Sequence, residues 1–217
     1  MMNLYRKLST LGVMVAAVSA GAQSWDLEGN WAPPANPNGT WQYGQMAGGA
    51  VFSPLAWDST TLSYGTGTAG NVFVYQNTSG SLAYGIQPGD VSLEADWGDA
   101  AVQWTAPASA TYAFNIALGG TLQNAGGGYG NNFAGYGAVA VNGTQVGMSS
   151  FTSNTKFWSF NETLSAGSTV DAYVLNPGFA NGGNTNTLFS VNAVPEPAPL
   201  AAVAVGGLVF LRRRRRG

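Results

Sequence analysis

Short β-prone runs separated by turn residues constrain the fold of this chain more than any other feature of its sequence. The chain of 217 residues contains 31 glycines, and asparagine, serine and threonine are also abundant. Apart from the two ends, no segment shows a long apolar pattern with helical spacing. Many short runs of this kind, joined by turns, are typical of a domain built from β-strands alone. We therefore predict an all-β fold, a two-sheet sandwich of the jelly-roll type.

The expected strands share β-branched and aromatic residues and are bounded by turn residues. They are Thr61–Tyr64, Asn71–Gln76, Ser81–Ile86, Val91–Trp97, Ala101–Thr105, Thr111–Leu118, Tyr136–Val141, Thr144–Met148, Lys156–Leu164, Thr169–Leu175 and Thr187–Val194.

Alternation along the run Val91–Trp97 predicts which side chains share a face of the strand. A strand has a period of two, so one face carries the apolar residues and the other Ser92, Glu94 and Asp96. Asn142-Gly143 suits a type I′ hairpin turn, because both residues tolerate positive φ. Ala166-Gly167-Ser168 separates two further runs in a similar way. The expected core aromatics are Trp104, Phe114, Trp158, Phe160 and Phe189.

The first 22 residues have the order of a secretory signal peptide. Arg6 and Lys7 form a basic start, Leu8 to Val18 is apolar, and Ala20-Gly21-Ala22 is a small-residue cleavage site. We therefore expect residues 1–22 to be removed by signal peptidase after export through the secretion translocon. Residues 23–193 then form one domain, a length that suits a single core.

The last residues, 194–217, combine three features in a fixed order. Val194-Pro195-Glu196-Pro197 comes first, an apolar run of 14 residues to Leu211 follows, and Arg212, Arg213, Arg214, Arg215 and Arg216 close the chain before Gly217. Arginines after an apolar run are retained on the cytoplasmic side of a membrane. A membrane helix needs about 20 residues, so this short hydrophobic helix is expected to be a temporary anchor.

This C-terminal order resembles the PEP-CTERM sorting signal of Gram-negative bacteria, also called an ice-binding-protein C-terminal domain. The matching residues are Pro195, Glu196, Pro197, the apolar run and the arginine cluster, and the run is short and interrupted by Gly206-Gly207. The resemblance implies an inner-membrane-anchored precursor that an exosortase recognises and cuts near the PEP motif. The product is then delivered to the cell surface or extracellular matrix.

A second resemblance covers much of the remaining chain. It rests on the segments Asn36–Gly44, Val102–Ile116, Val141–Val146 and Glu162–Val174. They resemble a recurrent β-sandwich ectodomain of exported PEP-CTERM proteins, although Ala110 stands where a turn glycine is common. The domain is similar in style to carbohydrate-binding jelly rolls, and the resemblance implies no established enzymatic activity.

Charge and composition exclude several classes of function. Lys156 is the one basic residue of the mature domain, against nine acidic residues, which gives a net charge near −8. Nucleic-acid binding needs Lys and Arg for the phosphates, so it is not expected. The chain contains neither cysteine nor histidine, so thiol nucleophiles, thiolate metal sites and histidine-based triads are excluded. We expect no cofactor.

Two groups of side chains are candidate sites. Asp90, Glu94, Asp96 and Asp99 could bind calcium, or could supply the two carboxyls of a glycoside hydrolase, but the simpler interpretation is a solvated sheet face. Aromatic residues that could stack on sugar rings crowd the N-terminal quarter; the candidates are Trp31, Trp41, Tyr43 and Trp57, with Trp25 beside them. The simpler interpretation of this second group is a hydrophobic core.

Together these features predict a non-enzymatic exported protein with a structural or adhesive role in an exopolysaccharide matrix. A carbohydrate-binding module is the first alternative, and it requires exposed aromatics from the Trp25–Trp57 region. A carboxylate-dependent glycoside hydrolase is the second, and it requires two close acids in a cleft.

Overall fold

The computed structural model describes residues 23–47, 51–65, 72–95, 98–120, 135–151, 155–175 and 184–195. By its internal contacts the chain divides into a unit of residues Ala22–Val194 and a second unit made of its two ends. Both the signal peptide and the residues from Glu196 onward lie outside the described residues, so the PEP motif and the arginine cluster stay predictions. Within the described ranges, no helix has the length and apolar character that crossing a membrane requires.

Fourteen strands and no helix make up the regular structure of the described residues, which confirms the all-β prediction. The strands are β1 (Ser24–Asp26), β2 (Trp41–Ala47), β3 (Val51–Pro54), β4 (Ala56–Asp58), β5 (Ser63–Gly65), β6 (Val72–Gln76), β7 (Val91–Ala95), β8 (Asp99–Thr105), β9 (Ala110–Gly120), β10 (Gly135–Val141), β11 (Thr144–Phe151), β12 (Lys156–Leu164), β13 (Thr169–Leu175) and β14 (Asn184–Ala193).

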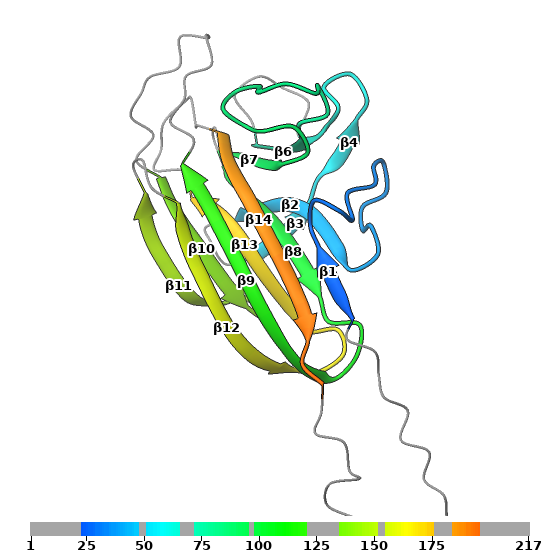
Figure 1. Cartoon of the computed structure of the whole chain (residues 1–217), viewed down its shortest axis with the longest axis vertical. Coiled ribbons are helices and arrows are strands. Elements are labelled where there is room, and N and C mark those ends of the chain that lie inside the picture. The colour runs from blue at the N-terminus through cyan, green and yellow to red at the C-terminus, as the bar shows by residue number, and fades with distance from the viewer. Residues whose placement is uncertain are drawn as a thin grey trace, which may run out of the picture. The chain divides into compact units, whose positions relative to one another are not determined.

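The strands form two antiparallel sheets that face each other (Figure 1). One has the order β12-β9-β14-β7-β6-β5-β4, with β1 beside β14, and the other has the order β11-β10-β13-β8-β2-β3. Strands β7 to β14 alone give β7-β14-β9-β12 against β8-β13-β10-β11. This is the double Greek-key order of a jelly roll, and it confirms the predicted sandwich. Strands β2 to β6 widen both sheets on the side of β7 and β8.

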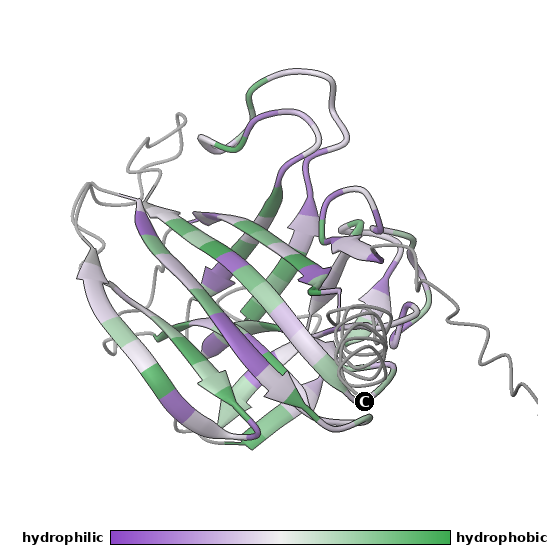
Figure 2. Cartoon of the chain, turned by 60° about the horizontal axis from the view of Figure 1, so that its bottom comes forward, coloured by the Kyte–Doolittle hydropathy of each residue, from purple (hydrophilic) through white to green (hydrophobic). Residues whose placement is uncertain are grey.

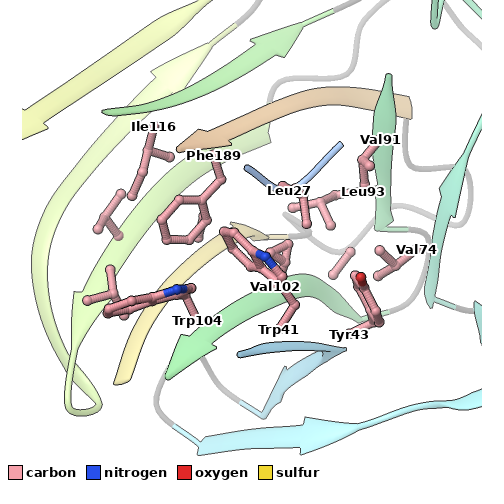
Figure 3. Close-up of a cluster of buried hydrophobic side chains, with 14 of the residues drawn as sticks. Leu27, Trp41, Tyr43, Val74, Val91, Leu93, Val102, Trp104, Ile116 and Phe189 are labelled. Atoms are coloured by element: carbon pink, nitrogen blue, oxygen red, sulfur yellow. The ribbon is translucent and has the colours of Figure 1, made fainter. Parts of the chain in front are cut away.

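Alternation along the strands produces the core between the sheets. Hydrophobic and hydrophilic residues alternate along most strands (Figure 2), so the hydrophobic side chains of a strand share one face, which is turned toward the core. Figure 3 shows Trp41, Trp104 and Phe189 meeting in the middle of the sandwich. The ring centroids of Trp41 and Phe189 are 5.0 Å apart, and those of Trp104 and Phe114 are 5.5 Å apart. These edge-to-face contacts fill the interior at close packing.

The predicted core aromatics are confirmed in the main. Trp104, Phe114 and Phe189 are almost fully buried. Trp158 and Phe160 are half-buried and pack against the same cluster from β12, which lies at the end of its sheet. Trp158 and Phe160 are less buried than the other three because β12 is the last strand of its sheet and has a neighbouring strand, β9, on one side only.

The predicted hairpin at Asn142-Gly143 is confirmed. Its two residues have φ angles of 49° and 74°, as a type I′ turn requires, and they join β10 to its neighbour β11. Ala166-Gly167-Ser168 does not make a hairpin, since β12 and β13 belong to different sheets. Its backbone bonds to Ala106 instead. The Gly167 N–H donates to the Ala106 carbonyl oxygen, and the Ala106 N–H donates to the Ser168 carbonyl oxygen, both at 2.8 Å.

Strand prediction failed in two places. Ser81–Ile86 is a turn, closed by an isolated bridge between Ala83 and Ile86, with positive φ at Tyr84 and Gly85. The four strands from β1 to β4 were not predicted, because prolines and glycines crowd the sequence around them. β1 and β2 are paired by strands distant in sequence, β14 and β8, whereas β3 and β4 pair with their chain neighbours β2 and β5.

We predict that Leu93→Ala lowers the free energy of unfolding by about 2–5 kcal/mol, because it leaves a cavity in the core. Leu93 is 0% exposed on β7. The matched control is Leu82→Ala, at a residue that is 51% exposed, and it should change stability by less than about 0.5 kcal/mol. Urea unfolding of both variants measures this, and equal losses would contradict the described core.

Candidate functional site

The structure separates the predicted sugar-stacking aromatics into two groups. Trp41 is 1% exposed and Tyr43 is 0% exposed, so neither ring can present a face to a sugar, and this part of the prediction is wrong. Both side chains point between the sheets (Figure 3) because they occupy the inward positions of β2. Trp31 and Trp57 are half-buried and keep part of their surface in solvent. Trp25 is half-buried against Trp104 and Tyr112.

Trp31 and Trp57 meet around one buried tyrosine, Tyr64 on β5. The ring centroid of Tyr64 lies 5.4 Å from that of Trp31 and 5.0 Å from that of Trp57. Tyr43 stacks on Tyr64 at 4.5 Å and also contacts Trp31 at 4.5 Å. We call Trp31, Tyr43, Trp57 and Tyr64 the Tyr64 aromatic cluster. Its two tyrosines are buried anchors, and its two tryptophans reach the surface.

Hydrogen bonds fix the loop that carries Trp31. The Asn36 side chain donates to the carbonyl oxygens of Tyr43 and Leu55, at 2.7 and 2.8 Å, and accepts from the Tyr43 N–H at 3.0 Å. The Tyr64 hydroxyl donates to the Ala35 carbonyl at 2.8 Å. This loop is therefore attached to β2, to the β3–β4 connection and to β5, which holds Trp31 in place against Tyr43 and Tyr64.

The same region holds a further amide network and one carboxylate. The Asn30 side-chain oxygen accepts from the Trp41 indole at 3.2 Å and from the Asp26 N–H at 3.0 Å. Asp58 follows Trp57 directly, and its carboxylate accepts from the Thr60 N–H at 2.8 Å. That backbone hydrogen bond lowers the pKa of Asp58, so the carboxylate stays ionised.

The cluster's tyrosines are neutral at ordinary pH. Burial raises the pKa of Tyr64 far above its usual value, with a smaller contribution from Tyr43. Burial also raises the pKa of Tyr43, whose buried hydroxyl has no hydrogen-bond partner among the described residues. Half-exposed indoles in a region with side-chain amides suit the binding of a neutral sugar. The rings can stack on its CH groups, and the polar groups can bind its hydroxyls.

The predicted acidic group does not gather at one place. Asp90 precedes β7 and Glu94 lies four residues further along it, a separation of about 13 Å in a strand. Asp99 begins β8 in the opposite sheet, and Asp96 lies outside the described residues. In the described ranges, no three carboxylates come together in a way that could hold a metal ion. A calcium site formed by these acids is therefore not supported by the three that are described.

Asp90 instead lies near Glu28, a residue that sequence reasoning did not select. Strands β1 and β7 both pair with β14, β1 opposite Ser190–Asn192 and β7 opposite Asn184–Thr187, so the chain after β1 meets the chain before β7. One carboxylate oxygen of Glu28, Oε1, is buried without a hydrogen-bond partner. Burial, then the charges of Asp90 and Asp26, raise the pKa of Glu28 to about 7.

A second carboxyl with a raised pKa lies on β13. Asp171 is almost fully buried, and burial raises its pKa to about 6, although a hydrogen bond from the Gln103 side chain at 2.7 Å opposes the rise. Tyr173 lies on the same side of β13, and its hydroxyl donates to Gln145 at 3.2 Å. These residues tie β8, β13 and β11 together on the outer side of their sheet.

No family model and no curated protein matches this chain. Solved structures do align with parts of it. A family 35 carbohydrate-binding module from an environmental isolate is 21% identical over 45% of this chain and 72% of its own, with a TM-score of 0.27. The native structure of a family 35 carbohydrate-binding module from Clostridium thermocellum is 14% identical over 78% of this chain and 90% of its own, with a TM-score of 0.28.

A third alignment is to the CBM36-1 domain of a multidomain xylanase from the hindgut metagenome of Trinervitermes trinervoides. It is 13% identical over 52% of this chain and 82% of its own, with a TM-score of 0.31. Identities and TM-scores this low do not identify a family or a ligand, so the functional argument rests on the site itself.

We predict that Glu28→Gln changes how stability depends on pH. The pKa of Glu28 is higher in the folded state, so folding favours its protonated form. The free energy of unfolding therefore falls as pH rises from about 4.5 to about 7. The variant removes the part of this fall that Glu28 contributes, whereas the part from Asp171 remains. It should therefore gain stability relative to the natural protein at pH 8 but not at pH 4.5. Urea unfolding at several pH values measures the difference.

Asp58→Asn is the control for this experiment. The pKa of Asp58 is lowered from 3.8, so its effect on stability is confined to pH values near and below 4. This variant should keep the natural slope between pH 5 and pH 8. If the free energy of unfolding changed with pH equally in the natural protein and in Glu28→Gln, the raised pKa could not belong to Glu28.

Proposed function

We propose that the sandwich is a non-catalytic carbohydrate-binding module, and that Trp31 and Trp57 stack on sugar rings. The observation that carries this proposal is the Tyr64 aromatic cluster, in which two half-exposed indoles are fixed by two buried tyrosines. Rings fixed before binding lose little conformational entropy when a ligand arrives. The acidic domain favours neutral over anionic glycans, since its charges repel carboxylated or sulfated sugars.

The module would serve as a structural or adhesive component of an exopolysaccharide matrix. This role is supported by the two predicted signals at the chain ends, which imply export and exosortase sorting. A surface protein that binds neutral polysaccharide needs no catalytic residues and no cofactor. The chain's lack of histidine and cysteine is compatible with such a role.

The first test is binding of residues 23–194 to neutral polysaccharides, measured by affinity electrophoresis. We expect Trp31→Ala and Trp57→Ala each to weaken binding about tenfold, because truncating an anchoring aromatic commonly costs more than about 1 kcal/mol. Trp57→Phe keeps a ring and should retain most of the affinity.

Tyr136→Ala is the matched control, since it removes a 42% exposed aromatic from β10 in the other sheet. Circular dichroism establishes that each variant is folded. Equal losses for the tryptophan variants and the control, or unchanged binding in both tryptophan variants, would sink the proposal that these rings form the site.

The sorting signal has its own test in a host that carries an exosortase. Replacing Pro195-Glu196-Pro197 by alanines should leave an uncut precursor in the membrane fraction. The natural protein should leave the membrane with a C-terminus near Val194. Fractionation followed by intact-mass measurement distinguishes the two. A natural product that keeps its arginine tail in the membrane, identical to the variant, would exclude exosortase processing.

A further inference from the structure

Strand β12 is an open sheet edge of unusual composition. All nine of its residues, Lys156–Leu164, pair with β9 in one uninterrupted register. No strand among the described residues pairs with its other side, and Figure 1 shows it at the border of its sheet. Its outward backbone N–H and C=O groups are therefore available to another strand.

Natural edge strands are usually protected by proline, bulges or several charges. Strand β12 contains no proline, shows no break in its pairing with β9, and carries one charge near each end, Lys156 and Glu162. Phe157 on this strand is 75% exposed, although it is a large hydrophobic residue. Trp158 and Phe160 are only half-buried. Apart from these two charges, the strand lacks the features of a protected edge, and its exposed aromatic residue is typical of an interface.

We propose that β12 pairs with β12 of a second copy of this chain, antiparallel and centred on Ser159. In this register Lys156 of each copy lies opposite Glu162 of the other, and Trp158 lies opposite Phe160. Lys156, Trp158, Phe160 and Glu162 share one face of the strand, because the period is two. The pairing is isologous, as the interface of a two-fold dimer requires.

Charge complementarity selects this partner and this register. Lys156 is the one basic residue between residues 23 and 194, and nine acidic residues accompany it. It makes no ion pair with any described residue of its own chain. Centring the pairing on Phe160 would place Lys156 opposite Leu164, and centring it on Trp158 would place Lys156 opposite Phe160. Of these three registers with matching faces, only the one centred on Ser159 pairs the charges, and it does so twice.

The dimer would join the two β12-containing sheets into one continuous sheet and cover Trp158 and Phe160 on both copies. Cross-strand pairs of opposite charge and of aromatic residues stabilise such a junction. It would also carry two Tyr64 aromatic clusters on one particle. Two sites on one particle increase the apparent affinity for a polymer without any new contact. The dimer itself does not depend on the carbohydrate proposal.

Charge reversal tests the pairing. The domain of residues 22–194 contains the whole core, so it can be used without the terminal signals. We expect sedimentation velocity to show a dimer. Lys156→Glu and Glu162→Lys, each alone, should raise the dimer dissociation constant about tenfold or more, because two attractive pairs become repulsive.

An equimolar mixture of the two single variants should form a heterodimer. One copy then offers two acids and the other two lysines, so both pairs are attractive again. Asp58→Lys is the matched control. It makes the same change of charge on β4, at the far end of the same sheet, and should leave the natural dissociation constant unchanged. Because rescue by mixing requires folded variants, it also excludes misfolding as the cause of the loss.

Cysteine cross-linking tests the register, since the chain has no cysteine of its own. Ser159→Cys should give a disulfide-linked dimer under mild oxidation, because the two Ser159 positions face each other within reach of a disulfide. Asn161→Cys should not, because its two copies would be about 13 Å apart along the strand. A monomer at all concentrations, failure of the mixed variants to associate, or cross-linking at residue 161 in place of 159 would overturn the proposal.

Discussion

The aromatic core between the two sheets is the interaction on which the rest of this structure depends. The chain has no disulfides and few charged residues, so burial of apolar surface must stabilise the fold. Trp104 contacts Trp25, Tyr112 and Phe114, and Phe114 continues to Phe189 and Phe160. These rings come from both sheets and from the strand β1 beside them. A single connected set of ring contacts therefore determines how the sheets are stacked.

The candidate site is an extension of this core. Tyr43 and Tyr64 are as fully buried as the central tryptophans, yet each contacts a tryptophan that reaches the surface. The loop from Trp31 to Thr40 is attached through Asn36 to β2 and to the β3–β4 connection. Rigidity at the site thus comes from the packing beneath it. A binding surface made in this way needs no ligand-induced ordering, which suits recognition of a repeating polymer.

The two ends of the β12-containing sheet differ in how they are finished. At one end, β4 is only three residues long, and a very short strand is one of the ways in which an edge is protected. At the other end, β12 is nine residues long and exposes Phe157. The Tyr64 aromatic cluster lies toward the first end and the open edge is at the second. Sugar binding and pairing with a second copy would therefore use separate parts of the domain.

The sequence by itself determined the all-β class, most of the strands from β6 to β14, the turn at Asn142-Gly143 and the central rings Trp104, Phe114 and Phe189. These depend on local rules, since a period of two assigns side chains to faces and Asn-Gly permits positive φ. The strong excess of acidic over basic residues between residues 23 and 194 also follows directly from the sequence. The terminal signals are also sequence features, and they remain predictions because most of their residues lie outside the described ranges.

Only the tertiary structure decided which strands are neighbours, and therefore which residues meet. Alternation gives the face of a strand but not its partner or its sheet. Trp41 and Tyr43 became core residues because β2 pairs with β8, about sixty residues away, and Ala166-Gly167-Ser168 crosses between sheets for the same kind of reason. Glu28 meets Asp90 because both β1 and β7 pair with β14. Such long-range pairing is set by how the whole interior packs, and no local pattern in this sequence encodes it.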